Sequence, residues 1–300
     1  MTELGPIRTA LFVPGNRPDR VDKAVNSGAD AVIIDLEDAV ALGEKEKVRP
    51  MVREKILEHV DRKIIVRVNA MDSQFFQGDL NEVIVPGLGC IIVPKVEQVD
   101  HIREINRHLL HTEREKGLAP GTISIIPLIE SAKAMQNIFQ IVSEKTDPIR
   151  LLTVAFGSAD YTLDMGIEMT KEGAELLYPR SRISIACRAA DVEPPLDTPF
   201  MVDLKDMEAL KADAKIAKQL GFQGKLCVHP NQIEPCNAIF SPTREEILYA
   251  EKVVQAFDEA EAKGIAVFQL DGKFVDYAVV ERSRRVLKLA VGIPKPGGDL

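Results

Sequence analysis

The stretch Ala31-Val32-Ile33-Ile34-Asp35-Leu36-Glu37-Asp38 indicates the fold, because an apolar run ends abruptly in acidic residues. Continuous apolar strands without alternation are typical of a parallel sheet covered by helices. Similar β-branched runs recur about every 31 residues, close to the roughly 30 residues of one βαβ unit. The eight runs are Thr9–Val13, Ala31–Leu36, Ile64–Val68, Cys90–Val93, Ile123–Ile129, Leu151–Phe156, a weaker one near Asp191–Leu196, and Lys225–Val228.

Helical spacing separates these runs, for example in Arg20–Gly28, Val96–Lys116 and Leu204–Leu220. Eight strand and helix units of this length predict a (β/α)8 TIM barrel over residues 1–240. The rival architecture is a doubly wound open sheet. No GxGxxG follows a strand and no GxxxxGK[ST] is present, so the rival loses its usual fingerprints without being excluded.

The pattern changes after Ile239, so residues 241–300 are predicted to form a C-terminal helical extension, a lid or an oligomerisation arm. Ser241-Pro242-Thr243-Arg244-Glu245-Glu246 is typical of a capped helix start. The helix should run to about Lys263, where Gly264 ends it. The remaining predicted segments are a strand at Ile265–Leu270, a turn at Asp271-Gly272, a helix at Asp276–Leu289 and a frayed end at Pro294–Gly298.

Composition and charge exclude several classes of protein. The 300 residues are 45% apolar and 28% charged, which excludes intrinsic disorder. The longest uncharged runs have 12 residues, and a membrane-spanning helix needs about 18, so no membrane span is expected. A net charge of −8 argues against a general nucleic-acid binder. Met1–Arg8 lacks the pattern of a secretion signal and the four cysteines form no CxxC pair, so we expect buried thiols and a cytoplasmic protein.

The predicted strands end in polar residues, and in such barrels reacting groups gather at the carboxyl ends of the strands. These residues are Asn16 and Arg17, the acids of Asp35–Asp38, Arg67 and Asn69, Lys95, Glu130, Asp160, Asp197 and His229. The other ends of the strands carry no comparable cluster of acids. The pattern therefore predicts an active site at one rim of the barrel.

Glu130 and Asp160 close the fifth and sixth runs, and two carboxylates at neighbouring strand ends suit Mg²⁺. The alternative is that each acid caps the helix that follows it. Zinc is not indicated, because HExxH and the usual finger spacings are absent.

Arg67 lies in a β-branched strand, where an unpaired guanidinium would be costly to bury. It forms either an ion pair with Glu37 or Asp38, or a clamp on a substrate carboxylate or enolate oxygen, and the two roles are compatible. The acids of Asp35–Asp38 form a supporting network, a general-base site or a solvated loop.

Asn16 and Arg17 follow Pro14-Gly15 near a helix start, where they could hold a phosphate or carboxylate. Helix capping by Asn16 or Asp19 explains them equally well. His229, before Pro230, is more typical of a packed, hydrogen-bonded histidine than of a catalytic base.

Seven motifs in order resemble one family over nearly the whole chain. They are Leu11–Asn16, Asp35–Val40, Val66–Asn69, Pro94-Lys95, Leu128–Ser131, Gly157–Tyr161, and Gly224-Lys225 through His229-Pro230. The chain resembles the citrate lyase β-subunit branch of the HpcH/HpaI aldolase superfamily. Gly272-Lys273-Phe274-Val275-Asp276 further resembles the C-terminal motif of its acyl-CoA lyase members.

The resemblance implies a homotrimer or hexamer that binds Mg²⁺ through Glu130 and Asp160 and holds substrate with Arg67. It implies reversible Claisen cleavage of a 3-hydroxyacyl thioester, of citramalyl-CoA, malyl-CoA or citryl-CoA type, to an acyl thioester and a 2-oxo acid. Asp276 would act as acid or base across a subunit interface, unless it only caps the last helix. Glu37 and Asp38 would orient Arg67 and water.

Two further points stay open at this level. Coenzyme A phosphates need cations that an acidic protein must supply locally, and Arg17, Lys95 and Lys225 are candidates. The alternative function is a citryl-acyl-carrier-protein lyase subunit that acts only inside a citrate lyase complex. A non-enzymatic barrel is disfavoured, because a scaffold does not need acids at successive strand ends.

Overall fold

The computed structural model describes residues 5–292 and divides the chain into two compact units, Met1–Ala238 and Ile239–Leu300. Within the described residues, no helix combines the length and the apolar content needed to cross a membrane. The four cysteines are buried free thiols, as predicted.

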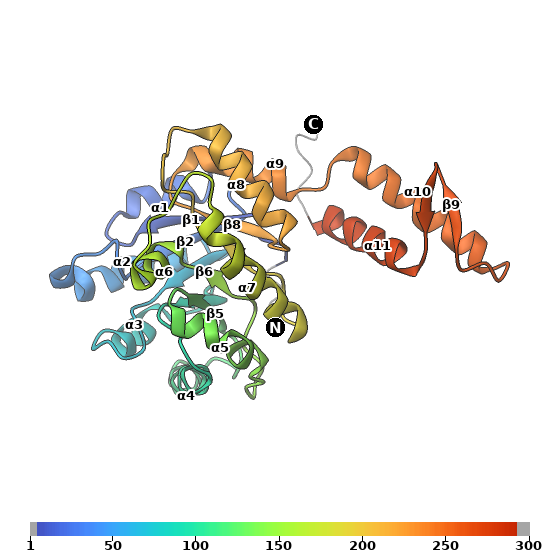
Figure 1. Cartoon of the computed structure of the whole chain (residues 1–300). Helices are drawn as coiled ribbons and strands as arrows, with labels where there is room; N and C mark the ends of the chain where they lie inside the picture. The colour runs from blue at the N-terminus through green and yellow to red at the C-terminus, as the bar shows by residue number, and fades with distance from the viewer. Residues whose placement is uncertain (1–4, 293–300) are drawn as a thin grey trace. The chain divides into compact units, whose positions relative to one another are not determined.

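The first unit is a closed barrel of eight parallel strands in sequence order (Figure 1). Because β1 pairs with both β2 and β8, the sheet closes on itself. The strands are β1 (Thr9–Pro14), β2 (Ala31–Asp35), β3 (Ile64–Arg67), β4 (Cys90–Val93), β5 (Ser124–Ile129), β6 (Ala155–Phe156), β7 (Leu196–Asp197) and β8 (Gly224–Cys227). The predicted (β/α)8 barrel is confirmed, and the open-sheet rival is wrong.

Helices follow the strands and surround the barrel (Figure 1). They are α1 (Pro18–Ala24), α2 (Lys45–Glu58), α3 (Phe76–Val83), α4 (Val99–Glu115), α5 (Ala132–Ser143), α6 (Ser158–Met165), α7 (Leu177–Ala189), α8 (Met207–Gln219) and α9 (Ile233–Phe240). Helix α4, for example, buries Ile102, Ile105 and Leu109, which share one side of the helix and form its apolar face.

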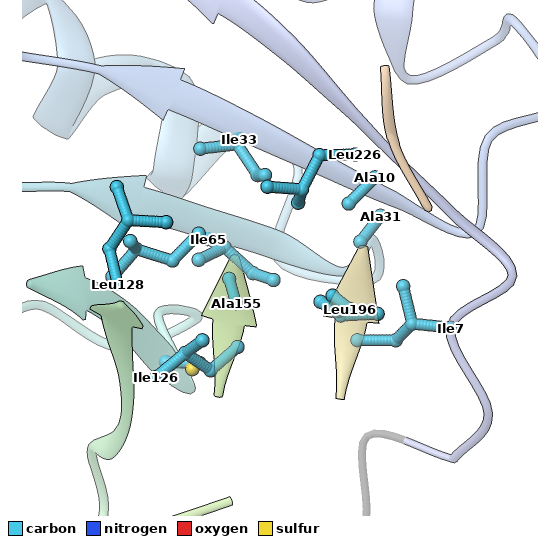
Figure 2. Packing of buried hydrophobic residues seen from close by; sticks show 12 residues of the cluster. Ile7, Ala10, Ala31, Ile33, Ile65, Ile126, Leu128, Ala155, Leu196 and Leu226 are labelled. Atoms are coloured by element: carbon cyan, nitrogen blue, oxygen red, sulfur yellow. The ribbon is translucent and has the colours of Figure 1, made fainter. Parts of the chain in front are cut away.

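A hydrophobic cluster with at least one residue from every strand fills the barrel interior (Figure 2). Burying each isoleucine or leucine contributes roughly 1.5–3 kcal/mol relative to exposure. Successive side chains of a strand point to opposite faces of the sheet. Because Leu196 and Leu226 belong to the interior cluster, their neighbours Asp197 and Lys225 face outward, toward the helices.

The sixth and seventh strands are shorter than predicted. The ladder between β6 and β7 pairs only Ala155 with Leu196, and Leu151 contributes an isolated bridge to Ile125. Pro194 and Pro195 precede β7 and have no N–H to donate, so the ladder begins at Leu196.

The second unit contains two helices and a β-hairpin. Helix α10 (Arg244–Glu261) begins with a capping box in which Thr243 and Glu246 exchange hydrogen bonds, as its sequence predicts. Strands β9 (Phe268–Leu270) and β10 (Lys273–Val275) pair antiparallel, although only the first was predicted. Helix α11 spans Tyr277–Gly292. A small core of Val253, Phe257, Val275 and Val280 holds these elements together. The frayed end predicted at 294–298 lies outside the described residues.

Candidate active site

The rim at the carboxyl ends of the strands carries polar side chains that continue the interior face of the barrel. Three of them each follow an interior residue by two positions: Asp35 follows Ile33, Arg67 follows Ile65, and Glu130 follows Leu128. Since side chains two residues apart share a face of the sheet, these groups point to the mouth of the barrel.

Arg67 is almost buried and is held by a two-pronged ion pair. Its Nε and Nη2 donate to the two carboxylate oxygens of Asp35 at 2.7 and 2.6 Å. Its Nη1 lies 3.1 Å from Glu37 and 3.2 Å from Asp38, and its guanidinium covers the ring of Phe12 at 5.0 Å. The predicted ion pair is present, but its main partner is Asp35 rather than Glu37 or Asp38.

The acidic segment after β2 is anchored from several sides. Asp35 accepts the backbone N–H groups of Glu37 and Ala39. The buried ammonium of Lys45 donates to the carbonyls of Leu36 and Glu37. Asp38 alone fits the reading as a solvated loop, because its side chain is 63% exposed whereas Asp35 and Glu37 are buried.

Glu130 is buried beside the end of β4. Its Oε1 accepts the backbone N–H of Lys95 at 2.7 Å. A Cβ at Gly157 would lie only 2.8 Å from Oε2 of Glu130, so the glycine makes room for this carboxylate. Ser131 accepts the N–H of Ala134 and caps α5, so the alternative that Glu130 caps this helix is wrong.

Lys95 adopts a left-handed backbone with φ of 56°. For a residue with a side chain this conformation costs about 1–2 kcal/mol. Its ammonium lies 3.5 Å from Glu37. Burial lowers the pKa of Lys95, but the charges of Glu37 and Glu130 outweigh burial and raise it overall.

Two buried carboxyls at the mouth hold protons unusually well. Burial raises the pKa of Glu37 to about 7, against the opposing charge of Arg67. Burial, followed by the charge of Glu37, raises the pKa of Glu130 to about 8. Burial disfavours the charged form of both groups, and the nearby cations only partly offset it.

Asp160 lies in the first turn of α6, which follows the strand paired with β5. Its charge adds to the raised pKa of Glu130, after burial and the charge of Glu37. Within residues 5–292 its carboxylate accepts no hydrogen bond. Asp160 therefore does not cap α6 by a hydrogen bond, although its charge is favourable near the positive end of this short helix.

The donor set at the mouth fits a hard divalent cation. Oε2 of Glu37 is buried and accepts no hydrogen bond in the part of the chain that the structure describes, although Nη1 of Arg67 lies 3.1 Å from it. Glu130 and Asp160 add carboxylate oxygens, the ligand type that Mg²⁺ prefers, although within residues 5–292 these three carboxylates do not approach one another as closely as a group of possible ligands on the surface does.

A second group of possible ligands lies on the surface. Asp22, Glu58 and His59 approach one another closely enough to bind a metal, a combination found nowhere else among residues 5–292. Lys55 donates to both carboxylates, at 2.9 and 2.6 Å, and neutralises them. These acids therefore already have a cation.

Asn16 and Arg17 lie at the start of α1, on the surface. Arg17 pairs with Asp19 at 3.0 Å, and neither Asn16 nor Asp19 caps the helix. A cleft of about 680 Å³ opens beside them. Arg17, Arg20 and Lys23 line it together with Asp19, Asp35 and apolar residues of β1, so it combines three cations, two acids and an apolar wall.

Lys225 is wrong as a candidate for coenzyme phosphates. It is fully buried, and its ammonium binds Asp197 and Asp213. Arg180 completes this neutral group with bonds of 2.9 Å to Asp197 and 2.7 Å to Asp213. Asp197 also faces outward, so it does not belong to the residues at the rim.

Two further candidates act as caps in the structure. His229 is exposed, and its Nδ1 accepts the N–H of Asn231 at the start of a short 3-10 turn, Pro230–Gln232. Asp276 accepts the N–H of Val279 at 3.0 Å and so caps α11. The catalytic role expected for Asp276 stays a prediction.

Residues 8–230 match the family described as HpcH/HpaI aldolase/citrate lyase. The chain belongs to this family. The predicted resemblance is thereby confirmed, as is the classification of the chain among lyases of this family.

Curated members of the family align over almost the whole chain. The citrate lyase subunit beta of Leuconostoc mesenteroides subsp. cremoris is 38% identical over 285 residues, covering 94% of this chain and 93% of that protein. The mitochondrial citramalyl-CoA lyase of Rattus norvegicus is 29% identical over 300 residues, covering 96% of this chain and 87% of that protein.

A solved structure shares the fold over both units. CitE of Mycobacterium tuberculosis, in complex with magnesium, acetoacetate and coenzyme A, superposes with a TM-score of 0.77 at 26% identity. The alignment covers 96% of this chain and 99% of that chain.

Proposed function

We propose that the chain is a Mg²⁺-dependent carbon–carbon lyase that cleaves a 3-hydroxyacyl coenzyme A thioester into an acyl thioester and a 2-oxo acid. The observation that carries this proposal is the group at the barrel mouth, where Glu130 and Asp160 stand on neighbouring strand ends beside Arg67. The magnesium and coenzyme A bound by the related CitE structure support it.

Glu130 and Asp160 would hold the metal, and the negative charge of Glu37, which acts on Glu130, would favour a cation there. When bound, Mg²⁺ supplies Lewis acidity that polarises the oxo group of the 2-oxo acid. The raised pKa of Glu130 means that this carboxyl loses its proton when it takes a cation.

The chain's own groups account for the rest of the chemistry. Cleavage breaks the C2–C3 bond of the thioester, the 3-hydroxyl loses its proton to become the oxo group, and the electron pair passes to a thioester enolate. Arg67 stabilises the negative charge as it develops, which lowers the barrier more than a ground-state contact would. Asp35 fixes two prongs of the guanidinium, so little reorganisation is needed.

The enolate carbon must then gain a proton, and in synthesis the same position must lose one. We assign this step to Asp276 of a neighbouring subunit in a trimer or hexamer. The second unit would thereby act as the lid or arm that its position after the barrel suggested. One oxygen of Asp276 caps α11, and the other accepts no hydrogen bond from the described residues, which leaves it for proton transfer in this proposal.

The coenzyme would enter through the cleft lined by Arg17, Arg20 and Lys23. Their charges suit phosphates, and the apolar wall suits the pantetheine arm. The burial of Lys225 and the contact of Lys95 with Glu37 leave this cleft as the better phosphate site. The proposed setting is the cytoplasm, in line with four reduced thiols.

The deciding experiment incubates the purified chain and Mg²⁺ with acetyl-CoA or propionyl-CoA and either glyoxylate, pyruvate or oxaloacetate. Formation of a 3-hydroxyacyl-CoA by one pair, lost in a chelator, is expected and would identify the 2-oxo acid. Full activity in the chelator would contradict the proposal.

The alternative is a citryl-acyl-carrier-protein lyase subunit that works only within a citrate lyase complex. The 38% identity to the Leuconostoc citrate lyase subunit beta favours it. Turnover of a carrier-bound thioester, without turnover of the coenzyme A thioester, would establish this alternative.

A further inference from the structure

The backbone and the side chain of Lys95 can be assigned different roles. Its backbone N–H fixes Glu130, and its left-handed conformation aims that N–H. Glycine would adopt this conformation more readily and would supply the same N–H. The lysine side chain is therefore not needed to hold Glu130, and residues in strained conformations cluster at active sites.

The side chain brings a cation that its surroundings do not fully engage. Arg67 directs Nε and Nη2 to Asp35, whereas within residues 5–292 the ammonium of Lys95 has a single ion pair, with Glu37 at 3.5 Å. The Lys95 side chain is 58% exposed, while that of Arg67 is 11% exposed. Of these two cations at the mouth, Lys95 is the one that can turn toward an incoming anion.

We propose that Lys95 is a substrate-binding residue whose ammonium leaves Glu37 to hold the carboxylate of the 2-oxo acid. This inference rests on the proposed function, and it assigns the recognition of an anionic fragment to a residue outside the metal ligands. A hydrated ammonium on a flexible stem suits a carboxylate already charged before the reaction. Arg67, with its fixed fork, is left for charge that develops during it.

The test measures binding of oxaloacetate in the presence of Mg²⁺ by isothermal titration calorimetry. We expect Lys95→Gly to bind oxaloacetate about 10- to 100-fold more weakly, the usual range for a hydrogen bond between charged groups. Mg²⁺ affinity without oxaloacetate should not fall, because the backbone N–H to Glu130 remains. Lys95→Arg should recover most of the affinity, and Lys95→Asn repeats the test in a side chain that tolerates φ above zero.

Asp191→Gly is the matched control, since Asp191 is another left-handed residue, with φ of 53°, and lies after α7. It should bind oxaloacetate like the unaltered chain. Equal oxaloacetate affinity in Lys95→Gly, or a parallel loss of Mg²⁺ affinity, would overturn the inference alone. So would weaker coenzyme A binding with unchanged oxaloacetate binding. Failure of the unaltered chain to bind any of glyoxylate, pyruvate and oxaloacetate with Mg²⁺ would overturn the proposed function as well.

Discussion

Protons and Mg²⁺ should compete for Glu130, and this competition can be measured directly. The ordinary pKa of a glutamate is 4.5, and burial followed by the charge of Glu37 raises that of Glu130 to about 8. A carboxyl with a raised pKa favours the folded state at low pH, and the advantage is lost as pH rises toward 8. The metal-free chain should therefore lose stability between about pH 5 and pH 8, and Mg²⁺ should restore it.

The magnitude follows from the fraction of ionised carboxylate. Two pH units below its pKa, Glu130 is about 1% ionised, so Mg²⁺ affinity at pH 6 should be about 100-fold below its plateau, equivalent to about 2.7 kcal/mol. Affinity should rise about tenfold per pH unit up to pH 8. Because Glu37 titrates nearby, the two carboxyls respond as a coupled pair.

Isothermal titration calorimetry in buffers of different ionisation enthalpy reports the protons released per Mg²⁺. We expect about one proton near pH 7 and almost none at pH 9. Glu37→Gln removes a negative neighbour and should shift the profile to lower pH. Glu58→Gln, at the surface group, should leave it unchanged. Flat affinity from pH 6 to 8.5 without proton release would refute the reasoning.

Four substitutions test the remaining assignments. Glu130→Ala and Asp160→Ala should each abolish Mg²⁺-dependent turnover while circular dichroism shows an intact fold; activity of either in a chelator would end the metal assignment. Asp276→Asn keeps a good helix cap but loses the carboxylate. We therefore expect kcat to fall about 100-fold or more while Tm is unchanged. An unchanged kcat would show that Asp276 only caps the helix. Gly157→Ala places a Cβ 2.8 Å from the Glu130 carboxylate and should weaken Mg²⁺ binding by about tenfold, whereas unaltered binding would mean that the carboxylate can move aside.

The barrel and its rim were predictable because both follow from short-range patterns. Apolar runs spaced by one βαβ unit give the closed sheet, and Arg67 and Glu130 at their ends lie at its mouth. The short β6 and β7 were harder to place, because the prolines before Leu196 shorten the ladder while leaving the hydrophobic pattern intact.

Residue type alone did not predict which side chains at the rim face the interior of the barrel and which face the helices. Lys225 seemed available to a coenzyme, but the interior position of Leu226 places it on the outer face. The two-residue alternation of a strand could have identified this, and also the partnership of Asp35 with Arg67. The left-handed backbone of Lys95 has no such signal, since lysine seldom adopts it.

The neutral group of Arg180, Asp197, Asp213 and Lys225 has a consequence for how this barrel can change. Removing one member leaves a buried charge without its counter-charge, a defect that typically costs about 3–5 kcal/mol of stability. Single exchanges are therefore poor evolutionary steps, and the four positions should be replaced together. Anyone building a chimera from two such barrels should place the crossover before α7 or after β8, so that all four come from one parent.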